Sequence, residues 1–155
     1  MKMLKINDLE RESFRKLGDY QELLSLGVKD NEGFFPDFLQ LDNEGKSASF
    51  SICRVGKQEI IKSVEYHTNC YEGILPLDGD IYIMAGPAHW FLQLDSISLF
   101  RVPKGTLVKI RQGVLHGSPI SCNGELVNVL ITLPERTYSN DCVFMELEEK
   151  DWMGY

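Results

Sequence analysis

The sequence lacks the features that mark several classes of protein. Its four cysteines include no C-x-x-C pair, and no apolar run approaches the roughly 18 residues that a transmembrane helix needs. It also lacks a basic excess, because 16 lysines and arginines face 23 aspartates and glutamates, for a net charge of −7. This balance argues against a nucleic acid or an anionic membrane as a partner.

The first residues also lack the apolar core of a signal peptide, so we expect a cytoplasmic protein. Thiols in that compartment stay reduced. We therefore expect the cysteines to be free, although their even number also suits two disulfides. They are Cys53, Cys70, Cys122 and Cys142.

A chain of 155 residues is most simply one domain, able to bury about two-thirds of its unfolded surface. Asn7 or Asp8 can cap a short helix that Gly18 ends. A second short helix or an extended lead-in is expected over 23–28, and then a loop anchored by phenylalanines up to residue 48. Residues 1–47 are thus predicted to be a helical and loop appendage packed on a core formed by residues 48–148.

From Ala48 the hydrophobic pattern changes to a period of two, which is typical of half-buried strands. Glycine, proline and asparagine turn signals separate the strand candidates at intervals of about ten residues. The candidates are 49–55, 60–67, 72–76, 80–85, 97–102, 106–111 and 125–133. Many short strands at this spacing indicate an all-β sandwich or barrel, here preceded by a short N-terminal helix.

Two short segments gather the side chains best suited to chemistry. One reads E-x-H-x4-E-x6-G from Glu65 to Gly79, and the other reads G-x5-R-x-G-x2-H from Gly105 to His116. Glu65 and His67 are two residues apart and would face the same side of a strand. With Glu72 and His116 they supply two carboxylates and two imidazoles, a set that suits Mn, Fe, Co, Ni or Zn.

These segments resemble the two motifs of the cupin superfamily, G-x5-H-x-H-x3-4-E-x6-G and G-x5-P-x-G-x2-H-x3-N. Glu65 stands at the first histidine of that pattern, Arg111 at its proline and Ile120 at its asparagine. The resemblance implies a single cupin-type β-barrel, also called a double-stranded β-helix or jelly roll. It also implies a divalent metal, Ni, Mn, Zn or Fe, held by Glu65, His67, Glu72 and His116.

A narrower resemblance, over roughly residues 60–148, is to the ureidoglycolate lyase family, whose members split ureidoglycolate into glyoxylate and urea in allantoin degradation, a part of purine metabolism. The matching segments are 64–67, 73–79, 113–116, 130–132 and 140–142. The sequence departs from the family at Tyr66, Thr68, Glu72 and Gly117, where that family usually has Arg, Pro, Gln and His. The resemblance implies a carbon–nitrogen lyase with a small anionic substrate.

For such a reaction we expect His67, Glu72 and His116 to be catalytic. Without a metal, Glu72 would act as the base, because a buried carboxyl near other acids has a raised pKa. Arg111 could clamp the substrate carboxylate, and Lys109, two residues earlier, would share its face.

Other interpretations of these residues remain open. His67 also suits a hydrogen-bonded strand histidine, and Glu65 suits a solvent-facing residue. Arg111 also suits a structural partner of Glu65 or Glu72. Cys70 suits a turn or core thiol better than a nucleophile.

Two other functions fit the same fold. One is another small cupin enzyme, an isomerase or a sugar-acid-processing protein, and the other is a non-catalytic cupin that binds a small anion. We also expect a homodimer that pairs through sheet edges. Near the C-terminus, Trp152 and Tyr155 are expected to dock on the barrel or on a second subunit.

Overall fold

The computed structural model describes residues 1–87 and 93–155, and it describes only the backbone at Leu26 and Gly27. Most of its regular elements are short strands. They are β1 (Lys2–Met3), β2 (Ile6–Asp8), β3 (Gly18–Glu22), β4 (Ala48–Val55), β5 (Ser63–Tyr66), β6 (Glu72–Pro76), β7 (Ile81–Gly86), β8 (Ser98–Val102), β9 (Thr106–Ile110), β10 (Leu115–His116), β11 (Ile120–Ser121), β12 (Val127–Pro134), β13 (Val143–Glu146) and β14 (Met153–Gly154). The short helices are α1 (Arg11–Phe14), α2 (Leu26–Lys29), α3 (Thr137–Asn140), η1 (Leu94–Ser96) and η2 (Glu149–Asp151).

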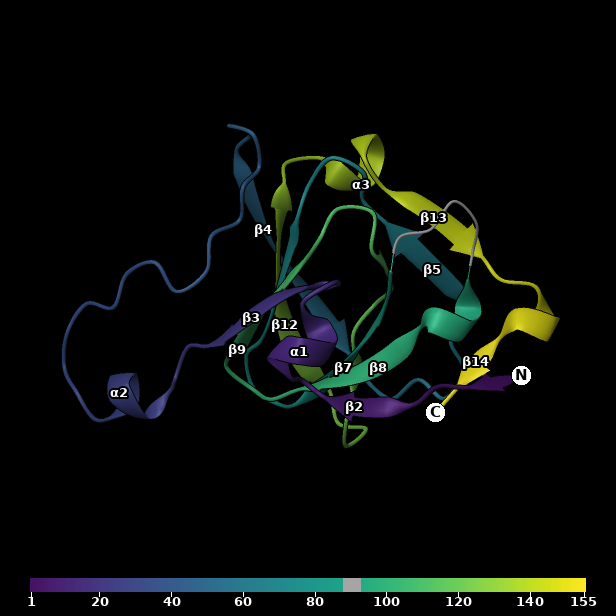
Figure 1. Ribbon diagram of the computed structural model, residues 1–155, viewed down its shortest axis with the longest axis horizontal. Coiled ribbons are helices and arrows are strands. Elements are labelled where there is room, and N and C mark those ends of the chain that lie inside the picture. The colour runs from purple at the N-terminus through teal and green to yellow at the C-terminus, as the bar shows by residue number, and fades with distance from the viewer. Residues whose placement is uncertain (88–92) are drawn as a thin grey trace.

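Two sheets build the body of the molecule (Figure 1). A five-stranded sheet has the order β3-β9-β6-β12-β4, and a seven-stranded sheet has the order β13-β5-β10-β7-β8-β2 with β11 beside β7. Pairs in both sheets are antiparallel, except that β2 runs parallel to β8. The predicted all-β, jelly-roll type of fold is confirmed, and each of the seven strand candidates overlaps an observed strand.

Alternation along the strands builds a core between the sheets. In β9, Thr106, Val108 and Ile110 are buried, whereas Leu107 and Lys109 between them are partly exposed. The main core joins side chains of both sheets, among them Ile74 and Val108 of the five-stranded sheet and Ile83 of the seven-stranded sheet. A second core, which includes Met84, Leu99 and Met153, lies on the other face of the seven-stranded sheet. Strand β7 contributes to both cores and is therefore buried on both faces.

The N-terminal segment differs from the prediction. Asn7 and Asp8 do not cap a helix but lie in β2, while α1 is a single turn whose N-cap, Glu10, makes no side-chain cap hydrogen bond. Gly18 begins β3 instead of ending the helix. The physical reason is backbone pairing, because β2 and β3 satisfy hydrogen-bonding groups at the edges of β8 and β9 that would otherwise be unpaired.

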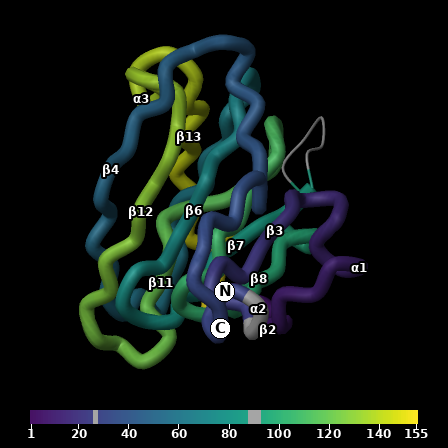
Figure 2. The backbone as a smooth tube through the Cα atoms, turned by 90° about the vertical axis from the view of Figure 1, so that its left-hand side faces the viewer, coloured from purple at the N-terminus to yellow at the C-terminus, as the bar shows by residue number. Residues whose placement is uncertain are grey.

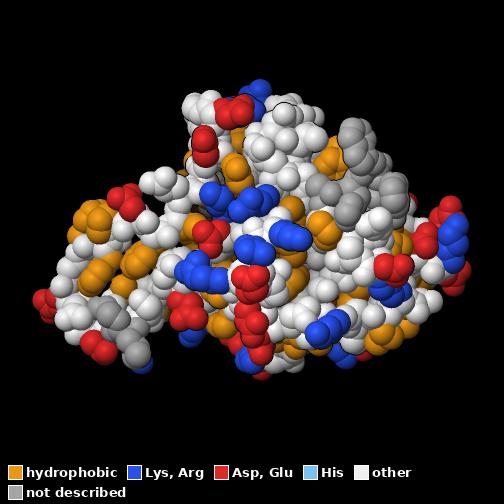
Figure 3. Space-filling model, viewed as in Figure 1, with side chains coloured by type: hydrophobic (Ala, Val, Ile, Leu, Met, Phe, Trp, Pro, Cys, Tyr) orange, Lys and Arg blue, Asp and Glu red, His pale blue; other side chains and the backbone are white. Residues whose placement is uncertain are grey.

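Residues 23–47 form an arm that leaves β3, loops away from the body and returns to β4 (Figures 1 and 2). Its helix, α2, lies a little later than expected. The arm is held near its return by Leu41, which sits over Gly73, and by the Gln40 carbonyl, which accepts a hydrogen bond from Lys109 Nζ at 2.8 Å. The expected aromatic anchor is wrong for Phe34, which is 88% exposed. Hydrophobic side chains are visible on the arm at the left of Figure 3.

The C-terminal segment packs on the second core. Trp152 Nε1 donates to the Leu147 carbonyl at 3.1 Å, and the Tyr155 hydroxyl donates to the Gln58 carbonyl at 2.6 Å. Both aromatic residues therefore dock on the barrel itself, and β14 pairs with β1. Within residues 1–87 and 93–155, no helix is long and apolar enough to cross a membrane.

Candidate metal centre

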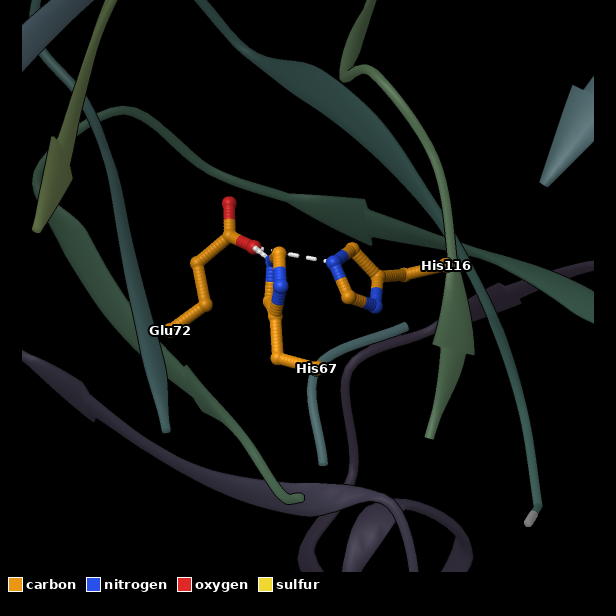
Figure 4. A group of neighbouring side chains, drawn as sticks. All are labelled: His67, Glu72 and His116. Carbon is orange, nitrogen blue, oxygen red and sulfur yellow. Dashed lines mark hydrogen bonds and ion pairs between the residues drawn. The ribbon is translucent and has the colours of Figure 1, made fainter. Parts of the chain in front are cut away.

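His67, Glu72 and His116 come together in the interior, between the two sheets (Figure 4). His67 directly follows β5, Glu72 is the first residue of β6, and His116 lies in β10. All three side chains are almost completely buried. Two sequence segments more than forty residues apart therefore meet at one point of the fold.

Backbone contacts align the two segments. His116 is the Cα partner of Glu65 across the β10–β5 pair. The amide of Gly113 donates to the carbonyl of His67 at 2.7 Å, and Gly113 has a φ of 75°. A residue with a Cβ adopts that left-handed conformation only with strain, so a glycine suits this turn. The glycine of the second segment thus ties the turn before His116 to His67.

The hydrogen bonds determine which ring nitrogen of each histidine carries a proton. His67 Nδ1 lies 2.8 Å from the Asp141 carbonyl, and His116 Nδ1 lies 2.8 Å from the Val114 carbonyl. A carbonyl oxygen only accepts, so both Nδ1 atoms donate. In the neutral imidazoles, both Nε2 atoms then present lone pairs.

Both Nε2 atoms point at the same carboxylate oxygen. Glu72 Oε2 lies 3.0 Å from His67 Nε2 and 2.8 Å from His116 Nε2 (Figure 4). Two lone pairs and a carboxylate oxygen at these distances repel one another unless positive charge lies among them. That charge is supplied either by protons on the imidazoles or by a bound cation.

In the metal-free protein the group behaves as an ion cluster. Burial by itself would lower the pKa of both imidazoles, but Glu72 outweighs this effect and raises the pKa of His67 and of His116. Burial would raise the pKa of Glu72, but the two imidazoles outweigh it and lower that pKa to about 2. The expected rise in the pKa of Glu72 is therefore wrong, and its carboxylate is a weak base.

The donor set suits a divalent transition metal. One ligand atom from each of the three residues lies within 4.8 Å of the other two. Two imidazole nitrogens and one carboxylate oxygen are ligands that Mn, Fe, Co, Ni and Zn accept. Both imidazoles also donate their other ring N–H to a backbone carbonyl, as metal-bound histidines commonly do.

Glu65 lies beside this group but outside it. Its Oε1 is 4.0 Å from His116 Nε2, and its side chain is 21% exposed. The thiol of Cys142 donates to the other carboxylate oxygen, Oε2, at 3.3 Å. Glu65 is therefore a carboxylate that both the metal group and solvent can reach, and its role as a metal ligand stays a prediction.

Lys109 and Arg111 are not brought to the group. Lys109 pairs with Gly73 across β9 and β6, whereas Glu72 pairs with Ile110, so Lys109 lies on the opposite face of the sheet from Glu72. Its ammonium group lies 4.5 Å from the centre of the Tyr71 ring and donates a hydrogen bond to the Gln40 carbonyl of the arm. Lys109 therefore lies away from the three-ligand group, and its role in substrate binding stays a prediction. Arg111 is exposed in the turn after β9, and its role stays a prediction.

Sequence reasoning did not assign a role to Asp141. Its carbonyl accepts from His67, and its carboxylate accepts from the backbone amides of Thr68 and Asn69 at 2.9 and 2.8 Å. It also accepts from Thr68 Oγ1 at 2.5 Å and from Asn69 Nδ2 at 3.2 Å. These contacts join residues more than seventy positions apart, and no local pattern around Asp141 indicates them.

The Asp141 carboxylate should stabilise the fold in a pH-dependent way. Burial would raise its pKa, but the hydrogen bonds from Thr68 and Asn69 outweigh burial and lower that pKa to about 2 from an ordinary value of 3.8. Its contribution is therefore complete above pH 3.8 and is lost as the pH falls through about 2. We expect Asp141→Asn to lower the free energy of unfolding by about 1–3 kcal/mol at neutral pH.

Urea unfolding of metal-free wild type and Asp141→Asn across this acid range measures the effect. The difference between the two proteins should shrink as the pH falls. A difference that stays constant with pH would show that the negative charge of Asp141 contributes nothing.

The cysteines are free, and Cys70, which lies between His67 and Glu72 in the chain, is buried. Burial raises the pKa of Cys70 to about 11, which suits a core thiol and not a nucleophile. His89, Trp90 and Phe91, whose sequence suggested packing, a lid or an interface, lie outside the described residues.

No known protein family matches the chain by its sequence profile, and no curated protein matches it. Similar solved structures include the oxalate decarboxylase of Lactobacillus farciminis in a formate complex, at 14% identity and a TM-score of 0.48, covering 66% of this chain and 27% of that one. The Bacillus subtilis oxalate decarboxylase, studied for its Mn(II) centres, has 12% identity and a TM-score of 0.47, covering 84% and 28%.

RmlC from Streptococcus suis, in complex with dTDP-D-xylose, is similar at 13% identity and a TM-score of 0.44, covering 59% of this chain and 45% of that one. The chain therefore spans less than half the length of each of these proteins. Its fold class rests on its own strand order.

Proposed function

We propose that the chain is a small cupin-type enzyme that holds a divalent metal with His67, Glu72 and His116 and acts on a small carboxylate. The observation that supports the metal is the convergence of two Nε2 lone pairs and one carboxylate oxygen, with both Nδ1 protons held by backbone carbonyls. A metal bound there would polarise substrate oxygens and lower the pKa of a coordinated hydroxyl.

The reaction that we propose is cleavage of ureidoglycolate, in line with the sequence resemblance. The substrate hydroxyl loses its proton, its C–O bond becomes the carbonyl of glyoxylate, and the C–N bond breaks. The urea nitrogen then takes up a proton. This reaction needs one group that accepts a proton and later returns it.

Glu65 is the residue best placed for that proton transfer. Glu72 is committed to two imidazoles, whereas Glu65 Oε1 faces the group from 4.0 Å and is partly open to solvent. The Cys142 thiol holds the other oxygen of Glu65 and leaves Oε1 available. In this proposal His67, Glu72 and His116 bind and orient, and Glu65 moves the proton.

The test is an assay for glyoxylate with ureidoglycolate, run with and without added Mn, Ni or Zn. His67→Ala should lose both metal binding and turnover, whereas Glu65→Gln should lose turnover and keep the metal. If ureidoglycolate binds but no glyoxylate forms with any of the metals, the result would instead favour an anion-binding protein. A turnover rate of His67→Ala equal to that of wild type would show that this site does not take part in the reaction.

We also propose that two copies pair through β4. This eight-residue strand is the edge of the five-stranded sheet, and its backbone groups on that side have no strand partner among the described residues. It carries no charge before Arg54, and Phe50 and Ile52 are 67% and 59% exposed. A long edge strand with exposed apolar side chains and little charge is a ready partner for a second strand.

Light scattering after size-exclusion chromatography should therefore give the mass of a dimer. A variant with Phe50→Lys and Ile52→Lys should run as a monomer, because lysines on an edge strand oppose pairing. Phe34→Lys is the matched control, since Phe34 is even more exposed but lies on the arm. A monomeric wild type, or a dimeric double variant, contradicts this proposal.

A further inference from the structure

We propose that Asp141 is the positioning residue for His67. Its backbone carbonyl fixes the imidazole ring, and its side-chain carboxylate fixes the turn that directly follows His67. The inference rests on the metal site proposed above. It assigns a function to a residue that lies outside the three-ligand group and more than seventy positions from His67.

The first step is the ring itself. The Asp141 carbonyl lies 2.8 Å from His67 Nδ1 and can only accept, so it holds the proton on that nitrogen. The lone pair of His67 is thereby placed on Nε2, the atom that faces Glu72 Oε2. Without this acceptor the neutral ring is free to protonate Nε2 instead and would then present no lone pair to a metal.

The second step is the turn. Thr68 and Asn69 directly follow His67 and lie between it and Glu72 in the chain. The Asp141 carboxylate accepts hydrogen bonds from both of their amides and both of their side chains. Asp141 therefore hydrogen-bonds both the ring of His67 and the turn that follows it, and so determines the position of His67 relative to Glu72.

The third step is how Asp141 reaches this place. It follows α3 and precedes β13, which pairs with β5 so that Val143 is the Cα partner of Tyr66. This pairing places the two residues before Val143 at the site, so that Asp141 contacts His67 and Cys142 contacts Glu65. The segment between α3 and β13 thus supplies two contacts to the site, from the Asp141 carbonyl to His67 and from the Cys142 thiol to Glu65.

The two histidines differ in a way that makes the inference testable. The Nδ1 acceptor of His116 is the carbonyl of Val114, two residues away in the same segment. The acceptor of His67 comes from a distant segment. A change at Asp141 should therefore disturb His67 and leave the ring of His116 unchanged, which provides a control within the same molecule.

The main variant is Asp141→Asn, which keeps the shape of the side chain but sets an NH2 group against the amide of Asn69. Asp78→Asn is its matched control. The Asp78 carboxylate bonds the amide and the side chain of Asn128 at 2.8 and 2.5 Å, in the turn that follows β6. Both variants remove one carboxylate that joins two distant parts of the chain, but only Asp141 also contacts His67, through its backbone carbonyl.

Two measurements apply to each protein. The first is calorimetric titration with Co(II) or Zn(II), together with the visible spectrum of the Co(II) complex. The second is long-range 15N–1H NMR of the metal-free protein, at a pH where the imidazoles are neutral, which identifies the nitrogen that carries the proton in each ring.

Asp141→Asn should bind metal about 10–100-fold more weakly, the usual loss when a contact that supports a metal ligand is removed. The variant keeps the backbone carbonyl of Asp141, but weakening the carboxylate contacts to Thr68 and Asn69 should displace that carbonyl from His67 Nδ1. The substitution should therefore also change the Co(II) spectrum and reduce the Nδ1-protonated form of His67, while His116 and the Asp78→Asn protein resemble wild type. If Asp141→Asn does not fold, Thr68→Val, which removes one hydrogen bond of the same clamp, should give a smaller change in the same direction.

The possible failures separate cleanly. Wild-type metal affinity and an unchanged His67 ring in Asp141→Asn would overturn the positioning role and leave the proposed metal site intact. A wild type that binds no metal, with the His67 ring still altered in Asp141→Asn, would overturn the proposed function and support the positioning role.

Discussion

Replacing Glu72 with glutamine is expected to reduce the affinity for a divalent metal by more than about 100-fold, since loss of a mere supporting contact already costs about 10–100-fold. Glu72 supplies the negative charge of the three-ligand group, and its Oε2 is the atom that both Nε2 atoms approach. The amide of glutamine has nearly the same shape but no charge, and its NH2 group repels a cation.

Calorimetry with Mn(II), Co(II) and Zn(II) measures the loss directly, and thermal unfolding provides a second readout. A metal at 100 times its dissociation constant stabilises the native state by about 2.7 kcal/mol. This stabilisation should appear in wild type and be absent in Glu72→Gln.

Glu148→Gln is the matched control for this experiment. Glu148 is exposed and pairs with Lys150 at 2.8 Å, away from the three ligands. It should keep the metal affinity of wild type. If Glu72→Gln also keeps that affinity, Glu72 is not a ligand and the metal lies elsewhere.

The second large effect concerns the N-terminal segment. Phe14→Ala is expected to lower the free energy of unfolding by about 3–5 kcal/mol, the usual cost of truncating a buried phenylalanine. Phe14 is completely buried in the core between the sheets. Its ring packs edge-on against Phe100 at 5.1 Å and Tyr20 at 6.4 Å between centroids. Because a domain is stable by about 5–15 kcal/mol, this loss removes a large part of the total.

Urea unfolding followed by fluorescence or circular dichroism gives the two free energies. Phe34→Ala makes the same change of side chain at an exposed position of the arm, so it should change the stability by less than about 0.5 kcal/mol. Equal effects of the two substitutions would contradict the expected contribution of Phe14 to the core.

The strands of the body were predictable because their signal is local. Period-two alternation and turn residues mark 72–76 and 106–111, which agree within one residue with the observed β6 and β9. The strands that were missed, such as β2, β10 and β13, have two to four residues. That length is too short to show a period, and these strands exist because a neighbouring edge offers hydrogen-bonding groups.

The same contrast holds at the site. Strand alternation indicates which side chains of one strand share a face, but the expectation that His116 joins His67 and Glu72 came from the resemblance of the two segments to the cupin motifs. The position of Lys109 does not follow from its spacing to Arg111. It depends on the register that pairs Gly73 with Lys109, which is set between strands.

The sequence by itself therefore determined the all-β body, because strand alternation and turn residues are patterns over a few neighbouring positions. The resemblance of two segments to the cupin motifs indicated which residues to expect inside it. The tertiary structure decided the rest. It placed Asp141 against His67, put the protons on both Nδ1 atoms and lowered the pKa of Glu72. These properties depend on which groups strand pairing brings within hydrogen-bonding distance, and residues that are far apart in the chain carry no local sign of it.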